Sequence, residues 1–130
     1  MTNKELKKYW INSAEENYNT MKNLFNSKDY TWSLFLGHLI IEKLLKALYA
    51  KKNEANPYAP KTHDLVFLAK KCDIDLDKKI EKRLYTITTF NINARYEDYK
   101  NTFKKKCTKE YTENEIKNIE EMRTWLLEQI

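Results

Sequence analysis

The sequence predicts an all-α protein, folded as an up-and-down bundle of four or five helices. Only one Gly and two Pro occur in 130 residues, which leaves little material for the tight turns that β-hairpins need. Apolar residues instead recur at helical spacing in several segments. Hydrophobic residues make up 42% of the chain, and no tract is of low complexity, so we expect one domain over residues 1–130 with its own core.

Two long helices are expected in the first half of the chain. The first runs from Asn3 to about Asn26, because apolar side chains recur on one of its faces: Leu6, Trp10, Ala14, Tyr18, Met21 and Phe25. Polar residues then interrupt the pattern, and Ser27 or Asp29 offers a cap for a second helix that runs to about Lys52. We expect these two helices to pack antiparallel.

Shorter helices are expected in the middle of the chain. After a loop over residues 53–60, Lys61 or Thr62 starts a third helix that continues through Cys72, and Thr62 has the side chain that an N-cap favours. Residues 73–77 then form a turn in which Asp75 can cap a fourth helix. The apolar residues of that fourth helix are Leu76, Ile80, Leu84 and Ile87.

The last third of the chain gives a weaker pattern followed by a clear one. Residues 91–109 lack regular apolar spacing, so we expect a loop with irregular helix there. Thr112 and Glu115 then match a capping box that opens the last helix. Its inward positions are Ile116, Ile119, Met122, Leu126 and Ile130.

The second helix carries three ionisable residues within an apolar surface. His38, Glu42 and Lys46 are spaced four apart and therefore form one row, with apolar positions on both sides. Burying such groups is costly unless they are paired or bound, so the row needs a partner in the fold, across a subunit interface or in a ligand. The simpler explanation is a Glu42–Lys46 ion pair beside a core histidine. We expect Glu42 to bond to Lys46, His38 or Arg95.

Four short motifs follow one another along the chain, and in this order and spacing they resemble the HEPN domain family. They are Trp10 with Ala14, Glu42-Lys43-Leu44-Leu45-Lys46-Ala47, Thr62-His63-Asp64-Leu65, and Ala94-Arg95-Tyr96. The family comprises small helical prokaryotic proteins that are often encoded beside a minimal nucleotidyltransferase. One departure is Glu97, which stands where many members carry Pro. The resemblance implies a homodimer, a possible nucleotidyltransferase partner and a place in a toxin-antitoxin-like or defence system.

The ribonuclease motif of many HEPN proteins is missing here. Those members use an Arg that stabilises charge on the scissile phosphate and a His, shortly after it, that moves a proton. In this chain His38 and His63 precede every arginine. We therefore expect no catalytic residues and a non-catalytic binding module. The alternative is a divergent metal-independent ribonuclease in which Arg95 stabilises the phosphate and His63 or His38 replaces the missing His in space.

Positive charge collects just before the last helix. The chain has a net charge of +5, and a run of lysines follows Arg95 and Tyr96. Lysine attracts phosphate as a point charge, arginine can grip it with two N–H groups, and tyrosine rings offer a stacking surface for a base. A solvated surface is the simpler explanation of such a run. The predicted binding residues for a nucleotide or RNA are His38, Glu42, Lys46, His63, Arg95 and Tyr96, with nucleic-acid contacts from Lys100, Lys104, Lys105 and Lys106.

Other classes of protein fit the sequence poorly. The longest apolar run, residues 34–41, is far shorter than the ~20 residues that span a bilayer, and the first residues do not form a secretory signal. We expect a cytoplasmic protein that does not enter a membrane. Cys72 and Cys107 have neither CxxC spacing nor clustered His, so we expect no disulfide, no metal site and no cofactor.

Aromatic residues gather at both ends of the second helix. Tyr30 and Trp32 lie near its start, and Tyr49 and Tyr58 lie near its end. One small bundle need not bury so much aromatic surface, so we expect these side chains to be exposed and to take part in the dimer interface. The alternative is that they fill the core of a single chain.

Overall fold

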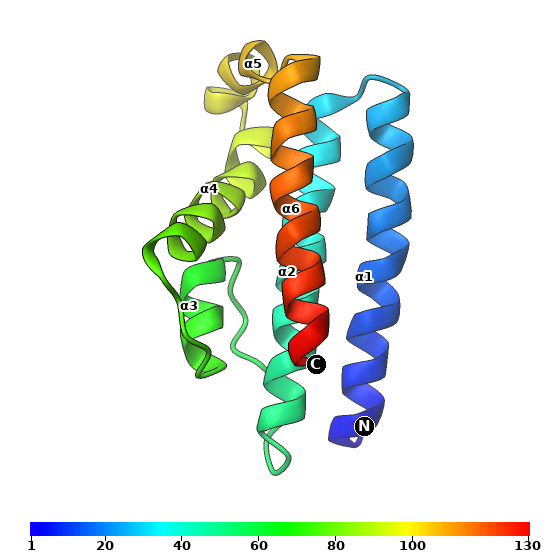
Figure 1. The fold of residues 1–130 in the computed structure, drawn as a ribbon. Coiled ribbons are helices and arrows are strands. Elements are labelled where there is room, and N and C mark those ends of the chain that lie inside the picture. Colours follow the sequence, from blue (N-terminus) through cyan, green and yellow to red (C-terminus); the bar gives the residue numbers. More distant parts are fainter.

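Six helices and no strands make up the computed structural model, which describes residues 1–130 (Figure 1). The prediction of an all-α bundle is confirmed. The long helices α1, α2, α4 and α6 alternate in direction along the chain, and both termini lie at the same end of the bundle. The helices are α1 (Asn3–Asn26), α2 (Tyr30–Lys52), α3 (Leu65–Lys71), α4 (Lys78–Arg95), α5 (Glu97–Lys106) and α6 (Lys109–Gln129).

The first two helices have the predicted bounds and pack antiparallel (Figure 1). Asp29 occupies the N-cap position of α2, but its side chain makes no capping bond and instead accepts from Ser27 Oγ at 2.7 Å. Helix α2 contacts every other helix, and about half of its residues are buried. An apolar helix of this kind belongs in the centre of a bundle. The polar row on α2 is therefore positioned by the best-packed element of the fold.

Gly37 lets α6 approach α2 closely. A Cβ atom at this position would lie 2.3 Å from Ile119 Cδ1 and 3.4 Å from Met21 Sδ. Both of those residues are buried, so the space beside Gly37 is already filled by side chains from α6 and α1. The single glycine of the chain thus marks the point where three helices meet.

Three predicted helix starts are wrong by a few residues. Helix α3 begins after Asp64, whose side chain accepts from Phe67 N, rather than at Lys61 or Thr62. Helix α4 is capped by Asp77 instead of Asp75, and α6 is capped by Thr108 instead of Thr112. Each true cap lies two or four residues from the predicted one and has an equally suitable side chain, so composition does not separate the two choices.

The expected loop over residues 91–109 is wrong, because most of this segment is helical. Helix α4 continues to Arg95, and after the extended Tyr96 the chain turns directly into α5. Helix α5 has one buried residue, Phe103, whose ring packs 5.7 Å from that of Phe90. One buried position in ten residues gives no apolar period, so the sequence did not reveal α5. The bundle therefore has six helices instead of the expected four or five.

The four aromatic residues expected in the dimer interface divide into two kinds. Trp32 and Tyr58 are exposed as expected, whereas Tyr30 and Tyr49 pack against the core, so the expectation is wrong for those two.

None of the six helices has the length and apolar content that crossing a membrane would require.

Candidate functional site

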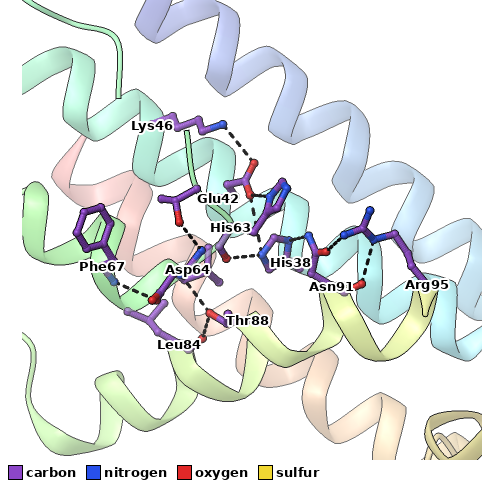
Figure 2. Close-up of polar contacts among 12 residues, drawn as sticks. His38, Glu42, Lys46, His63, Asp64, Phe67, Leu84, Thr88, Asn91 and Arg95 are labelled. Carbon is purple, nitrogen blue, oxygen red and sulfur yellow. Dashed lines mark hydrogen bonds and ion pairs between the residues drawn. The ribbon is translucent and has the colours of Figure 1, made fainter. Parts of the chain in front are cut away.

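A chain of polar contacts crosses the middle of the bundle and joins three parts of the fold (Figure 2). His38, Glu42 and Lys46 come from α2, and His63 comes from the connection between α2 and α3. Asn91 and Arg95 come from the last turns of α4. Five of the six predicted ligand-binding residues therefore meet in one network, and Asn91 is an additional member that the sequence analysis did not identify.

Glu42 is bonded on both sides. His63 Nδ1 donates to Glu42 Oε1 at 2.7 Å, and Lys46 Nζ donates to Oε2 at 3.3 Å. His38 Nε2 lies farther off, at 3.9 Å from Oε1. The expectation that Glu42 pairs with a basic group is confirmed for Lys46, while the closest partner is His63 and Arg95 is not a partner. Since Glu42 is only 5% exposed, these bonds compensate for burial of its carboxylate.

His38 is fully buried and uses both of its ring nitrogens within the protein. Nε2 lies 2.9 Å from the backbone oxygen of His63, and Nδ1 lies 3.4 Å from Asn91 Nδ2. A carbonyl oxygen can only accept, so Nε2 carries a proton. Burial lowers the pKa of His38, which favours the neutral ring with a free lone pair on Nδ1.

Asn91 holds the Arg95 guanidinium from two sides. Arg95 Nε donates to the Asn91 backbone oxygen at 3.1 Å, and Arg95 Nη2 donates to Asn91 Oδ1. The guanidinium also lies 5.7 Å from the ring centre of Phe35 and 5.6 Å from that of Tyr96. These contacts restrict an otherwise flexible and exposed side chain to one region of the surface.

Arg95 differs from the other two arginines because it has no carboxylate partner. Arg83 pairs with Glu121 and Arg123 pairs with Glu15, each at 2.6 Å. No ion pair involves Arg95, whose Nη1 makes no hydrogen bond within the chain. Arg95 therefore offers fixed and unneutralised N–H groups at the surface, which is the arrangement that an anionic group can use.

The two histidines differ in their access to solvent. The His63 side chain is 63% exposed, so its Nε2 can reach a solute, whereas His38 is enclosed. Hydrogen bonds through Asn91 and His38 connect Arg95 to the backbone oxygen of His63, not to its side chain (Figure 2). The structure thus does not bring the exposed histidine and the exposed arginine into direct contact.

A second feature lies beside Arg95, in a pocket of about 550 Å³ between the start of α2 and α5. Lys28, Lys100 and Lys104 contribute positive charge to it, and Asp29 and Glu97 contribute negative charge. Aromatic walls come from Tyr30 and Trp32, and the remaining lining residues are Thr31, Asn101 and Cys107. Trp32 packs edge-to-face on Phe35, the same ring over which Arg95 lies, so Phe35 links a wall of the pocket to Arg95.

The predicted lysine contacts separate in the structure. Lys100 and Lys104 line the pocket, and Lys100 also lies 3.7 Å from Glu97. Lys106 lies over the ring of Tyr111, and Lys105 is exposed without an ion-pair partner. Helix geometry explains this division, because residues four apart share a face and adjacent residues do not.

The remaining reactive side chains show no arrangement typical of a metal site. No group of three or more His, Cys, Asp or Glu side chains is close enough to hold a metal ion. Both cysteines are free and buried. Burial raises the pKa of Cys72 to about 11 and that of Cys107 to about 12, so neither thiol is activated as a nucleophile.

Sequence reasoning missed Asn91 and Lys28. The helical spacing of Asn91 from Arg95 was a usable signal, since side chains four apart on a helix meet. Lys28 gave no such signal, because the lysines across the pocket from it, Lys100 and Lys104 on α5, are far away in the sequence. As to known proteins, the HEPN domain model matches residues 7–130. The chain matches no curated protein and no solved structure.

Proposed function

The chain belongs to the HEPN domain family, and from that premise we propose that it is a non-catalytic module that binds the phosphate groups of a nucleotide or RNA. Arg95 is the observation that carries the proposal. Its guanidinium is exposed, held by Asn91 and free of any carboxylate, while both other arginines are neutralised. A restricted, unpaired guanidinium loses little conformational entropy when it binds an anion.

The pocket beside Arg95 supports the same proposal. Lys28 and Lys104 line it without forming an ion pair, and the ring of Tyr30 forms an aromatic wall on which a base can stack. The volume of about 550 Å³ lies in the range of small-molecule sites. A ligand that places phosphate on Arg95 and a base or a second phosphate in the pocket would use both features.

A binding role fits the histidines better than a catalytic one. General acid-base chemistry needs an imidazole within hydrogen-bond reach of the reacting oxygen, next to the group that stabilises the phosphate. His38 is enclosed with both nitrogens bonded, and no contact joins the His63 side chain to Arg95. A nucleotidyltransferase encoded nearby is a further proposed partner, which the family membership suggests.

Binding of a labelled single-stranded oligoribonucleotide tests the proposal. We expect weak affinity that falls steeply with salt, because phosphate contacts release counterions. Arg95→Ala should weaken binding and reduce the slope of log affinity against log salt by about 0.7, the value for one contact to a single strand. Arg123→Ala is the matched control, since Glu15 already neutralises Arg123. Equal effects of the two substitutions, or no binding at low salt, would contradict the proposal.

One observation favours a ribonuclease as the second candidate. The Glu42 carboxylate orients His63 through Nδ1 and leaves the exposed Nε2 able to accept a proton. The same labelled RNA, run on a denaturing gel, separates the two functions. Intact RNA is expected from the binding module. Cleavage that His63→Ala abolishes and Glu42→Gln reduces would establish the ribonuclease instead.

A further inference from the structure

Between Arg95 and His63, every side chain of the polar network donates in the same direction. Arginine has only donors, so the group of Asn91 that faces Arg95 must be the oxygen Oδ1. The amide nitrogen Nδ2 then faces His38 Nδ1, which must accept. His38 Nε2 finally donates to the backbone oxygen of His63. Each member has one orientation that satisfies both of its neighbours.

We infer that Asn91 and His38 are positioning residues for Arg95, which set the guanidinium geometry with which the module binds phosphate. The inference rests on the proposed function and extends it to two residues that do not touch the ligand. Neutral His38 accepts from Asn91, which fixes the amide so that Oδ1 points toward Arg95. The backbone oxygen of Asn91 holds Nε, and the guanidinium is left with Nη1 free for an anion.

The burial of these residues supports this role. Asn91 is 2% exposed and His38 is 0% exposed, so water cannot replace either partner at low cost. If His38 gained a proton, its Nδ1–H would face the Asn91 amide N–H groups. Turning the amide would relieve that contact and place N–H groups against Arg95 instead. The other titratable or charged groups that face His38 are Glu42, His63 and Arg95. The side-chain contact of Asn91 with Arg95 therefore requires a neutral His38, while the backbone contact does not.

The tautomers can be read directly from the unmodified protein. In ¹⁵N NMR spectra of the two imidazoles, we expect His38 to carry its proton on Nε2 and to have an unprotonated Nδ1 at neutral pH. His63, which donates through Nδ1 to Glu42, provides the contrast. A proton on His38 Nδ1 under the same conditions would overturn the inference without any substitution being made.

Two substitutions at one position test the effect on binding. Asn91→Ala keeps the Arg95 charge but removes the side-chain contact, so oligoribonucleotide affinity should fall about twofold to tenfold, the cost of ordering one long side chain. Asn91→Asp puts a carboxylate against the guanidinium, and the loss should match or exceed that of Arg95→Ala. Asn91→Asp should also raise the pKa of His38, because Nδ1 then faces a carboxylate.

The outcomes separate this inference from the proposed function. If Arg95→Ala weakens binding but both Asn91 variants bind as the wild type does, the positioning role is overturned and the phosphate site stands. If Arg95→Ala has no effect, the proposed use of Arg95 fails, whatever the Asn91 variants do. A purely structural asparagine would change the melting temperature without changing the RNA affinity of the folded protein.

Discussion

At the scale of single residues, the buried polar groups of α2 are stabilised by partners from other parts of the chain. Glu42 and Lys46 are four apart on one helix, and that contact was predictable from spacing alone. The bonds from His63 to Glu42 and from Asn91 to His38 join residues that are 21 and 53 positions apart. Sequence spacing carries no information about such pairs, so only the fold identifies them.

Removing the Glu42 side chain should destabilise the fold. Glu42→Ala leaves Lys46 and His63 without the carboxylate that they bond to, and we expect the free energy of unfolding to fall by about 1 to 3 kcal/mol. Urea denaturation at neutral pH measures the change. Glu54→Ala is the control, because Glu54 is exposed and takes part in no ion pair. An unchanged midpoint for Glu42→Ala would show that its contacts contribute nothing net to stability.

His38 should make the protein less stable in acid. The lowered pKa means that the folded protein keeps His38 neutral at a pH where the unfolded chain has taken up a proton. As the pH falls below about 6.5, the unfolded state is therefore favoured, by at most about 1.4 kcal/mol for each pH unit. The stability is regained as the pH rises toward neutrality. Unfolding free energies of the wild type and of His38→Gln at several pH values should show a shallower slope for the variant, and parallel slopes would contradict this account.

At the scale of elements, helices with many buried positions were predictable and those with few were not. Helices α1 and α2 repeat apolar residues over more than five turns, and their bounds are as predicted. Helix α5 has only Phe103 buried, so no period marks it. Its first residues, Glu97 and Asp98, are acidic, and negative charge favours the N-terminal turn of a helix. This acidic pair therefore suits a helix that starts directly after Tyr96.

The contact of α2 with α6 should be sensitive to the size of residue 37. Gly37→Val places branched carbon atoms where Ile119 already lies, and overpacking of this kind costs about 1 to 3 kcal/mol. Thermal unfolding should show a lower melting temperature. The double variant Gly37→Val with Ile119→Ala should recover part of the loss, because it reopens the space. A double variant whose loss equals the sum of the two single losses would show that the residues do not compete for that space.

At the scale of the whole molecule, α2 is apolar around most of its surface but is not covered on all sides. Trp32, Phe35 and Leu36 remain exposed or half-buried near its N-terminal half. Helices that are apolar all round are usually enclosed, so this side is available for another subunit. The homodimer that the family resemblance implies stays a prediction.

Light scattering tests that prediction. At micromolar concentration we expect a mass of about twice the 15.7 kDa of one chain. Trp32→Glu should shift the mass toward that of one chain, because it places a charge in the proposed interface. Lys51→Glu, a change at an exposed position on the same helix, is the control. A wild-type mass of one chain would contradict the dimer.

The central claim is that Arg95, alone among the three arginines, is available to phosphate. Its most direct test follows the three arginine Nε–H signals by NMR while a short single-stranded oligoribonucleotide is added. Arg83 and Arg123, both neutralised by glutamate, are internal controls. We predict that the Arg95 signal shifts saturably at low salt and that the other two stay in place. An unmoved Arg95 signal, or three signals that move together, would contradict the claim.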